Sequence, residues 1–171
     1  GTEKGNYFFS LGYFKNDGTI KHTDFDRFSA RMNADYKLFN DIVTIGENFT
    51  VNRTSEVQAP GDVLDMALKA LPLIPVHTAD GQGWGGPTTG MQDRHNPARL
   101  LYDNKDNAYQ FWRLFGNAFV NIEPIKGLNI RSNFGIDYNN YYKRTMQHSF
   151  VSGTLHSDLN SVNLEQSHST K

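Results

Sequence analysis

The sequence has no cysteine, which excludes a disulfide framework, thiol catalysis and cysteine-based zinc sites. It also has almost no net charge. Lysine and arginine number 17 against 18 acidic residues, and with a pI near 6.6 there is no basic footprint for nucleic acid. No segment holds about 18 consecutive apolar residues, so no transmembrane helix is expected. A transmembrane β-barrel would instead be recognised by alternation.

Aliphatic residues are scarce, but aromatic ones are not. Hydrophobic residues make up 37% of the chain and the mean hydropathy is −0.59, yet aromatic residues reach 13%. This balance, with frequent asparagine, favours strands and turns over a helical bundle and is unlike a disordered chain. The chain has neither an initiator methionine nor a charged-then-apolar leader, so we expect it to be a piece of a longer protein.

The clearest pattern is the alternation over residues 27–38. Even positions from Phe28 to Leu38 are all apolar, and odd positions from Arg27 to Lys37 are all polar. Period two predicts a strand with two chemically different faces. The same period recurs in four other segments, although Glu47 interrupts the apolar face of one of them. The sequence therefore predicts five strands, at about residues 6–15, 25–39, 42–55, 108–123 and 127–144.

The connections between these strands alternate between short and long. Asn40-Asp41 and Pro124 to Gly127 form tight turns, whereas residues 56–107 form a very long connection. Outer-membrane barrels are built in this way, with short turns at one end, long loops at the other, and aromatic girdles near the strand ends. The fold class predicted is all-β, an antiparallel up-and-down meander forming part of a large transmembrane β-barrel. The alternative is a half-buried antiparallel sheet in a soluble protein.

The long connection at residues 56–107 should contain structure of its own, because structureless loops of that length are rare in compact domains. Apolar residues recur at helical spacing between Gly61 and Leu71, and Pro72 then ends the pattern. We expect one short helix there, and a second ordered patch at residues 96–101.

Several segments together carry a family resemblance. Residues 5–13 (Gly-Asn-Tyr-Phe-Phe-Ser-Leu-Gly-Tyr) and 28–36 look like early barrel strands, and residues 70–76, 80–81 and 96–98 look like the long loop, of the SusC/RagA-type TonB-dependent outer-membrane receptors. Residues 116–119, 125–128 and 134–137 continue the match in the same order. The resemblance runs over nearly the whole chain.

This resemblance implies a barrel of 22 strands with an N-terminal plug, of which the chain would supply about a quarter of the wall. It implies localisation in the outer membrane of a Gram-negative, Bacteroidetes-like cell, and import of oligosaccharides or peptides powered through TonB. It also implies a SusD-like surface lipoprotein as a partner. No plug or TonB-contacting segment is present in these 171 residues. Glu47 departs from the pattern: it lies near a membrane interface, or faces a neighbour, or the register slips there.

Two sets of candidate site residues follow. Polar residues on the inward side of the strands are predicted to line the lumen or contact the plug, the alternative being solvated side chains without partners. They are Arg27, Arg31, Asp35, Asn117, Arg131, Asn133 and Asp137. Substrate contact is the second prediction, because an aromatic ring beside polar groups is ordinary for a glycan site. The candidates are Trp84, Asp93, Arg94 and Tyr102. The alternative is a loop that packs on itself or contacts the lipoprotein.

No catalytic, cofactor or metal site is expected. The six histidines form no metal-binding pair with a carboxylate at helical spacing, and the glycine-rich stretch at residues 81–86 lacks the lysine of a phosphate loop. We therefore expect a transporter and not an enzyme. The alternatives are a soluble β-sheet module that binds carbohydrate and a secreted adhesin-like sheet.

Overall fold

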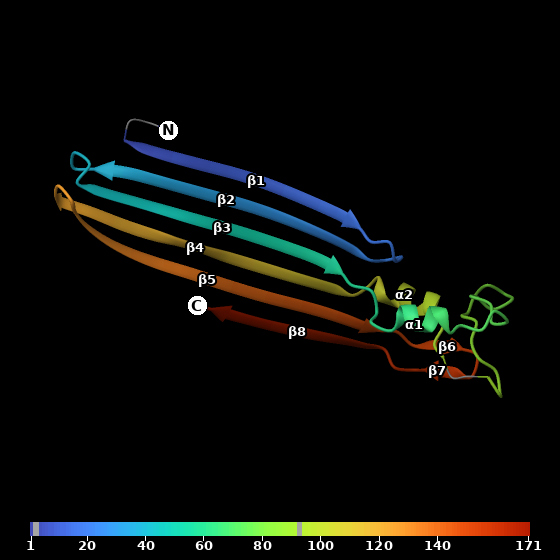
Figure 1. Cartoon of the computed structure of the whole chain (residues 1–171). Coiled ribbons are helices and arrows are strands. Elements are labelled where there is room, and N and C mark those ends of the chain that lie inside the picture. The colour runs from blue at the N-terminus through green and yellow to red at the C-terminus, as the bar shows by residue number, and fades with distance from the viewer. Residues whose placement is uncertain (2–3, 92–93) are drawn as a thin grey trace.

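The computed structural model describes residues 1, 4–91 and 94–171, and its main feature is one long antiparallel sheet (Figure 1). Six strands lie in the order β1-β2-β3-β4-β5-β8. Their bounds are β1 Gly5–Asp17, β2 Asp24–Leu38, β3 Val43–Val57, β4 Ala108–Ile125, β5 Leu128–Gln147 and β8 Ser161–Thr170. All neighbours in the sheet are consecutive in the chain apart from β5 and β8, which are separated by a small hairpin. The predicted all-β antiparallel meander is confirmed.

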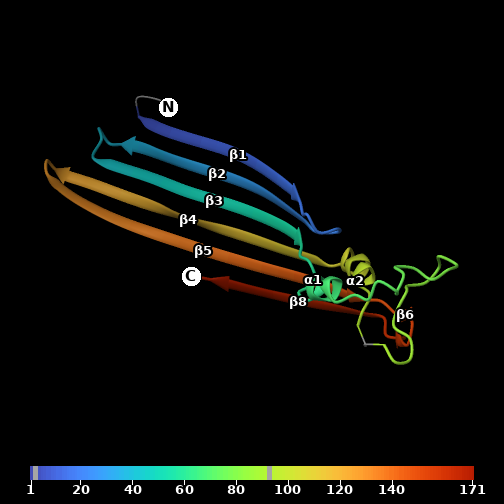
Figure 2. The ribbon, with the colours of Figure 1, turned by 45° about the vertical axis from the view of Figure 1, so that its right-hand side comes forward.

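The loops gather at one end of the sheet, as Figures 1 and 2 both show. At that end lie residues 18–23, 58–91, 94–107 and 148–160, whereas the strand connections at the opposite end are the tight turns at residues 39–42 and 126–127. Three consecutive residues of the first tight turn, Phe39 to Asp41, have positive φ. Gly127 supplies the positive φ of the second turn, where a residue without Cβ is favoured. Long and short connections therefore alternate along the chain.

The loop end contains two helices and a hairpin. The helices are α1 (Val63–Leu68) and α2 (Pro97–Asn104), and the two-stranded sheet pairs β6 (Phe150–Ser152) with β7 (Leu155–Ser157). The expectation of a single helix was therefore wrong. Asn96 caps α2 and Pro97 occupies its first turn, a sequence signal for a helix start that the second ordered patch already carried. No helix among the described residues is long and apolar enough to cross a membrane.

The strand β8 was not predicted. Its residues alternate only at Val162 and Leu164 before the pattern becomes polar, so hydrophobic periodicity is too weak to reveal it. Its backbone pairing with β5 defines it instead, from Gln147 opposite Ser161 to Tyr138 opposite Thr170. The five predicted strand ranges overlap β1 to β5.

The sheet is a single layer. Within the described part of the chain, Val63 in α1, at 3% exposure, and Pro87 in the loop are the buried residues with apolar side chains, and many large apolar side chains on the strands are exposed. A soluble domain normally buries a sheet against a second layer. This sheet has no such layer, so its apolar face has to be covered by something outside these residues.

The pairing registers sort the strand residues onto two faces without interruption from β1 to β4. Paired residues in adjacent strands project from the same side of a sheet. The apolar face includes the even-numbered residues of β2, β4 and β5 and the odd-numbered residues of β1 and β3. Glu47 pairs with Ala34 on one side and Ala118 on the other, with no shift in either register. The explanation that the register slips at Glu47 is therefore wrong.

The apolar face has a defined height. One boundary row is Leu38-Val43-Ile122-Ile130 near the tight turns, and the other runs through Phe28, Arg53 and Trp112 near the loops. The next row toward the loops is already polar on four strands, with Lys15, Asp26, Ser55 and Gln110. From Leu38 to Phe28 is ten residues, or about 34 Å along an antiparallel strand.

Aromatic residues do not all lie where a girdle would need them. Tyr13 and Trp112 belong to the boundary row on the apolar face, and the Arg53 guanidinium lies 5.6 Å from the Trp112 ring centre. Tyr109 and Tyr141, by contrast, project from the polar face. A lipid-facing role for these two is excluded if the apolar face is the one that meets lipid.

Candidate functional site

The seven predicted inward residues all project from the polar face, because every one has odd numbering in β2, β4 or β5. The register alone brings them together from positions more than one hundred residues apart. Their exposure to a lumen or a plug stays a prediction. The structure adds the side-chain partners that the sequence could not supply.

Most of these polar residues pair with one another or with neighbours on the same face. The Asp137 carboxylate accepts two hydrogen bonds from Arg113, at 3.1 and 2.8 Å, and a third from Asn139 at 3.1 Å. Asn48 donates to the Asn117 side chain at 3.4 Å, and Asn6 donates to Asp35 at 3.3 Å. These contacts all lie within the sheet, and whether the residues also meet a lumen or plug partner stays a prediction.

Arg31 and Arg131 make the same local hydrogen bond. Each donates from Nε to the asparagine two residues further along its strand: Arg31 to Asn33 at 3.3 Å and Arg131 to Asn133 at 3.2 Å. Arg131 also lies 4.1 Å from the centre of the Phe119 ring, which in turn covers Gly46. These guanidinium groups are thereby oriented along the face before any ligand is present.

Two hollows open on this polar face. One is bordered by Arg31, Asn48, Phe115, Asn117 and Asp137, and the other by Arg27, Asn52, Phe111, Arg113 and Tyr141. Each combines an aromatic ring with amide and charged groups. Sequence reasoning missed Arg113, although continuing the β4 alternation back by one step from Phe115 would have placed it on this face.

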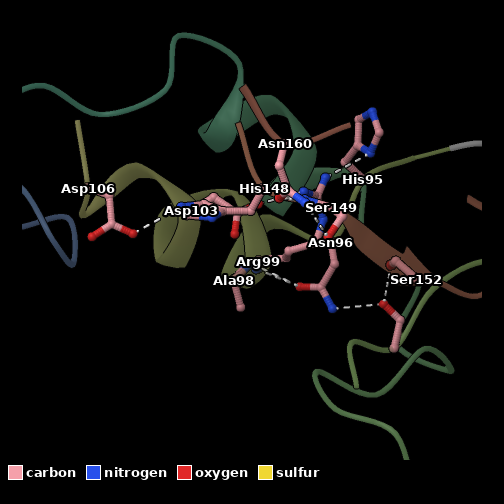
Figure 3. Close-up of polar contacts among 11 residues, drawn as sticks. His95, Asn96, Ala98, Arg99, Asp103, Asp106, His148, Ser149, Ser152 and Asn160 are labelled. Carbon is pink, nitrogen blue, oxygen red and sulfur yellow. Dashed lines mark hydrogen bonds and ion pairs between the residues drawn. The ribbon is translucent and has the colours of Figure 1, made fainter. Parts of the chain in front are cut away.

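The described residues of the two loop segments, 58–91 with 94–107 and 148–160, pack into one body, which we call the loop module (Figure 3). Asn96 lies at its centre and is 7% exposed. Its Oδ1 accepts from the backbone N–H groups of Ala98 and Arg99 at 3.0 and 3.4 Å, which caps α2. Its Nδ2 donates to the carbonyls of Val76 and Gly85, each at 2.9 Å.

The second loop segment joins the first through the buried hairpin residue Ser152. Its Oγ donates to the Gly85 carbonyl at 2.8 Å, and the backbone N–H of Thr154 donates to the Pro87 carbonyl at 2.8 Å. The contact is so close that a Cβ on Gly86 would lie 2.0 Å from the Ser152 carbonyl oxygen. Glycine is required there for space.

Arg99 is the buried charge of the loop module, with 4% exposure. It donates to Asp103 at 2.7 Å, lies 3.1 Å from the Nδ1 atom of His95, and stacks 3.7 Å from the centre of the Phe150 ring. Burial lowers the pKa of the Arg99 guanidinium, and the Asp103 carboxylate opposes that change. The cation and the ring join α2 to β6.

The predicted substrate residues are placed in two different surroundings. The Trp84 ring lies 4.7 Å from that of His77 and 5.5 Å from that of Tyr102, and the Lys105 ammonium lies over Tyr102 at 3.5 Å. Arg94 lies 3.6 Å from Asp65 of α1. Asp93 falls outside the described residues. Trp84 and Tyr102 are thus brought together, in a loop that packs on itself, and their contact with substrate stays a prediction.

The loop module also contains a partly open pocket of about 110 Å³. Its lining is mainly apolar and includes Leu71, Ile74, Val76 and Pro97, with Asn96 at one side. Among the described residues there is no group of three or more histidine, aspartate or glutamate side chains that could hold a metal ion.

No family model matches the chain. A TonB-dependent receptor of Formosa agariphila is 26% identical over 140 residues, which cover 81% of the chain. The chain spans only 14% of the length of that receptor. The similarity supports the TonB-dependent receptor family in general, and the SusC/RagA type stays a prediction.

Proposed function

We propose that the chain forms part of the wall of the transmembrane β-barrel of a TonB-dependent receptor, which imports a nutrient across the outer membrane. The observation that carries this proposal is the apolar band on one face of the sheet. Its boundary rows are ten residues apart, about 34 Å along the strands, and at a barrel tilt near 42° this is about 25 Å of vertical height. That is the height of the lipid-facing band of outer-membrane barrels.

The arrangement of the loops agrees with a barrel wall. Barrels of this kind have short turns on the periplasmic side and long loops outside. The loop module would then lie on the cell exterior and the tight turns in the periplasm. The polar face, with its amide and charged groups, would face the lumen and the plug.

We infer further that the receptor is SusC-like and not an enzyme. In this proposal it carries oligosaccharides or peptides, receives energy from TonB through a plug outside these residues, and pairs with a SusD-like surface lipoprotein. The support is the resemblance of the strand and loop segments, together with the exposed Tyr102 ring and the hollows of the polar face. TonB-dependent uptake of labelled oligosaccharides and peptides by cells that produce the receptor would test it. Uptake that is unchanged without TonB would contradict it.

A pair of adjacent substitutions tests the membrane orientation of the sheet. Met32 lies near mid-height on the apolar face, and Asn33 is the next residue, on the polar face. In the full-length protein folded into lipid vesicles, Met32→Arg should lower the free energy of unfolding by about 2–4 kcal/mol. Asn33→Arg should lower it by less than about 1 kcal/mol, because that side chain remains in a polar environment.

Urea titration of the folded barrel, read by the mobility of unheated samples in SDS gels, gives both values. Equal effects of the two substitutions would mean that the apolar face does not meet lipid. The barrel-wall proposal would then have to be abandoned.

A further inference from the structure

Glu47 is an acidic residue in the middle of the apolar face. Its row reads Tyr7-Ala34-Glu47-Ala118-Phe134, the third of the six rows that make up the apolar band. Because the registers on both sides of Glu47 are continuous, its carboxylate projects from the same face as Ile45 and Phe49. The inference below rests on the proposed barrel, in which this face meets lipid.

The depth of Glu47 rules out a position at the membrane interface. The boundary residue of the same strand, Val43, is four residues away, which is about 14 Å along the strand and about 10 Å of depth at a barrel tilt. A glutamate side chain cannot span that distance. Ionisable groups at such depth are expensive and usually mark a functional contact.

The carboxylate has no partner within the described part of the chain: none of the side-chain hydrogen bonds or ion pairs there involves Glu47. The nearest arginine on the same face, Arg53, lies six residues away along β3, which is about 20 Å. Glu47 is half-buried, and the side chains paired with it are the small ones of Ala34 and Ala118. Together with Tyr36 and Ile45 these residues line a shallow notch around the carboxylate.

We propose that this notch binds the lysine or arginine side chain of a membrane-embedded segment of another protein. A basic group would neutralise the carboxylate where lipid cannot, and charge attraction is strong at low dielectric. The two alanines allow that segment to approach closely, as small residues do at contacts within membranes.

Two other occupants fit less well. A second copy of this sheet, related by a two-fold axis along the membrane normal, would meet Glu47 at the same depth, where the row offers tyrosine, alanine, phenylalanine and a second glutamate but no basic residue. The amine of a lipid headgroup would remain at the interface, about 10 Å away in depth. Only a basic side chain carried into the bilayer by a protein segment reaches the notch.

The test measures how Glu47 reacts with dicyclohexylcarbodiimide, a lipid-soluble reagent that modifies carboxyl groups in membranes. Full-length receptor is compared in its native outer membranes and, after purification, alone in phosphatidylcholine vesicles. Peptide mass spectrometry quantifies the adduct on Glu47, and Glu47→Gln confirms its assignment. If Glu47 pairs with a basic side chain of another protein, native membranes should give at least about tenfold less adduct on Glu47 than vesicles. Alternatively, the reagent should produce an amide bond from Glu47 to a lysine of that protein.

Equal adduct yields in the two membranes would overturn the proposal, as would an amide bond to a second copy of the receptor. Failure of the barrel proposal gives a separate result. In that case Glu47 would react with a water-soluble carbodiimide in vesicles as readily as Glu123, which lies beside the tight turn at Gly127. In a lipid-facing notch, Glu47 should resist that reagent while Glu123 reacts.

Discussion

Replacing Asn96 by alanine should loosen the packing of α2 against Val76 and Gly85, and so weaken the loop module around them. The side chain caps α2, a role worth about 1 kcal/mol. It also donates to the carbonyls of Val76 and Gly85, and each net hydrogen bond contributes about 1 kcal/mol. Both carbonyls keep a second donor, the N–H of Gly85 and the hydroxyl of Ser152 respectively, so no larger penalty for an unsatisfied group is expected.

The sum is about 3 kcal/mol of local stability, which is roughly a 150-fold acceleration of hydrogen exchange for amides that open with the loop module. The reporters are the N–H groups of Gly85 and Thr154, which donate to Val76 and Pro87. Asn96→Ser is the matched variant, because serine retains the cap but loses the two amide donors. This variant should lower the local stability by about 2 kcal/mol, which accelerates hydrogen exchange roughly 30-fold.

Exchange mass spectrometry on the detergent-solubilised protein measures both variants. Amides of the β3–β4 pairing serve as the control and should keep their rates. Acceleration below about threefold at Gly85 and Thr154 would refute the central role of Asn96. Equal acceleration in β3 and β4 would refute the idea that the loop module opens separately from the sheet.

Two further substitutions test the polar face and the exposed tip of the long loop. A Cβ at position 46 would lie 2.4 Å from the Phe119 ring, whose centre is 4.1 Å from the Arg131 guanidinium, so Gly46→Ala should cost about 1–3 kcal/mol in urea titration. Gly135→Ala on the same face, where a Cβ would lie 3.7 Å from the nearest atom, should leave the stability nearly unchanged. In the Gly46→Ala background, Phe119→Ala should restore part of the lost stability. An equal loss of stability from Gly46→Ala and Gly135→Ala would contradict this account. In the loop, the hydroxyl of Thr78, more than the N–H of Gln82, holds the pKa of Asp80 below its usual range. Because the folded-state pKa is depressed, this contribution is complete above the ordinary carboxyl pKa and is lost as the pH falls through the depressed value. Thr78→Val should therefore move the acid transition in exchange of the Gln82 amide to higher pH, and an unmoved transition would show that Thr78 does not set it.

The sheet could be predicted because its cause is local. Every even residue from Phe28 to Leu38 is apolar, and a two-residue period can satisfy two different solvents only as a strand. The turns at Asn40-Asp41 and at Gly127 then fix the registers, which in turn fix the seven polar residues on one face. Strand β8, which was missed, forms for a non-local reason. Its position is set by backbone pairing with the edge of β5 and not by a hydrophobic periodicity in its own sequence.

The interior of the loop module could not be predicted in the same way. The contact between Ser152 and Gly85 joins positions 67 residues apart, and no periodicity connects them. The clustering of Trp84 with Tyr102 likewise depends on how the loop folds back on α2. The burial of Arg99 is hard to predict for another reason. A charged residue on a short helix is normally assigned to the surface, whereas Arg99 is buried against Phe150.

The attachment of the loop module to the strand ends has a mechanical consequence. Asn107 accepts a hydrogen bond from the backbone N–H of Met146 at 2.8 Å and donates to Asn104 at 2.9 Å, while His148 lies 3.0 Å from Asp106. These contacts tie α2 to the ends of both β4 and β5. A force applied to the outer loops is therefore transmitted to β4 and β5 as shear between the two strands. It is not absorbed by a flexible linker. The rim of the sheet is stiff at this point, so any opening of the loop module requires its internal bonds to break while its base stays in place.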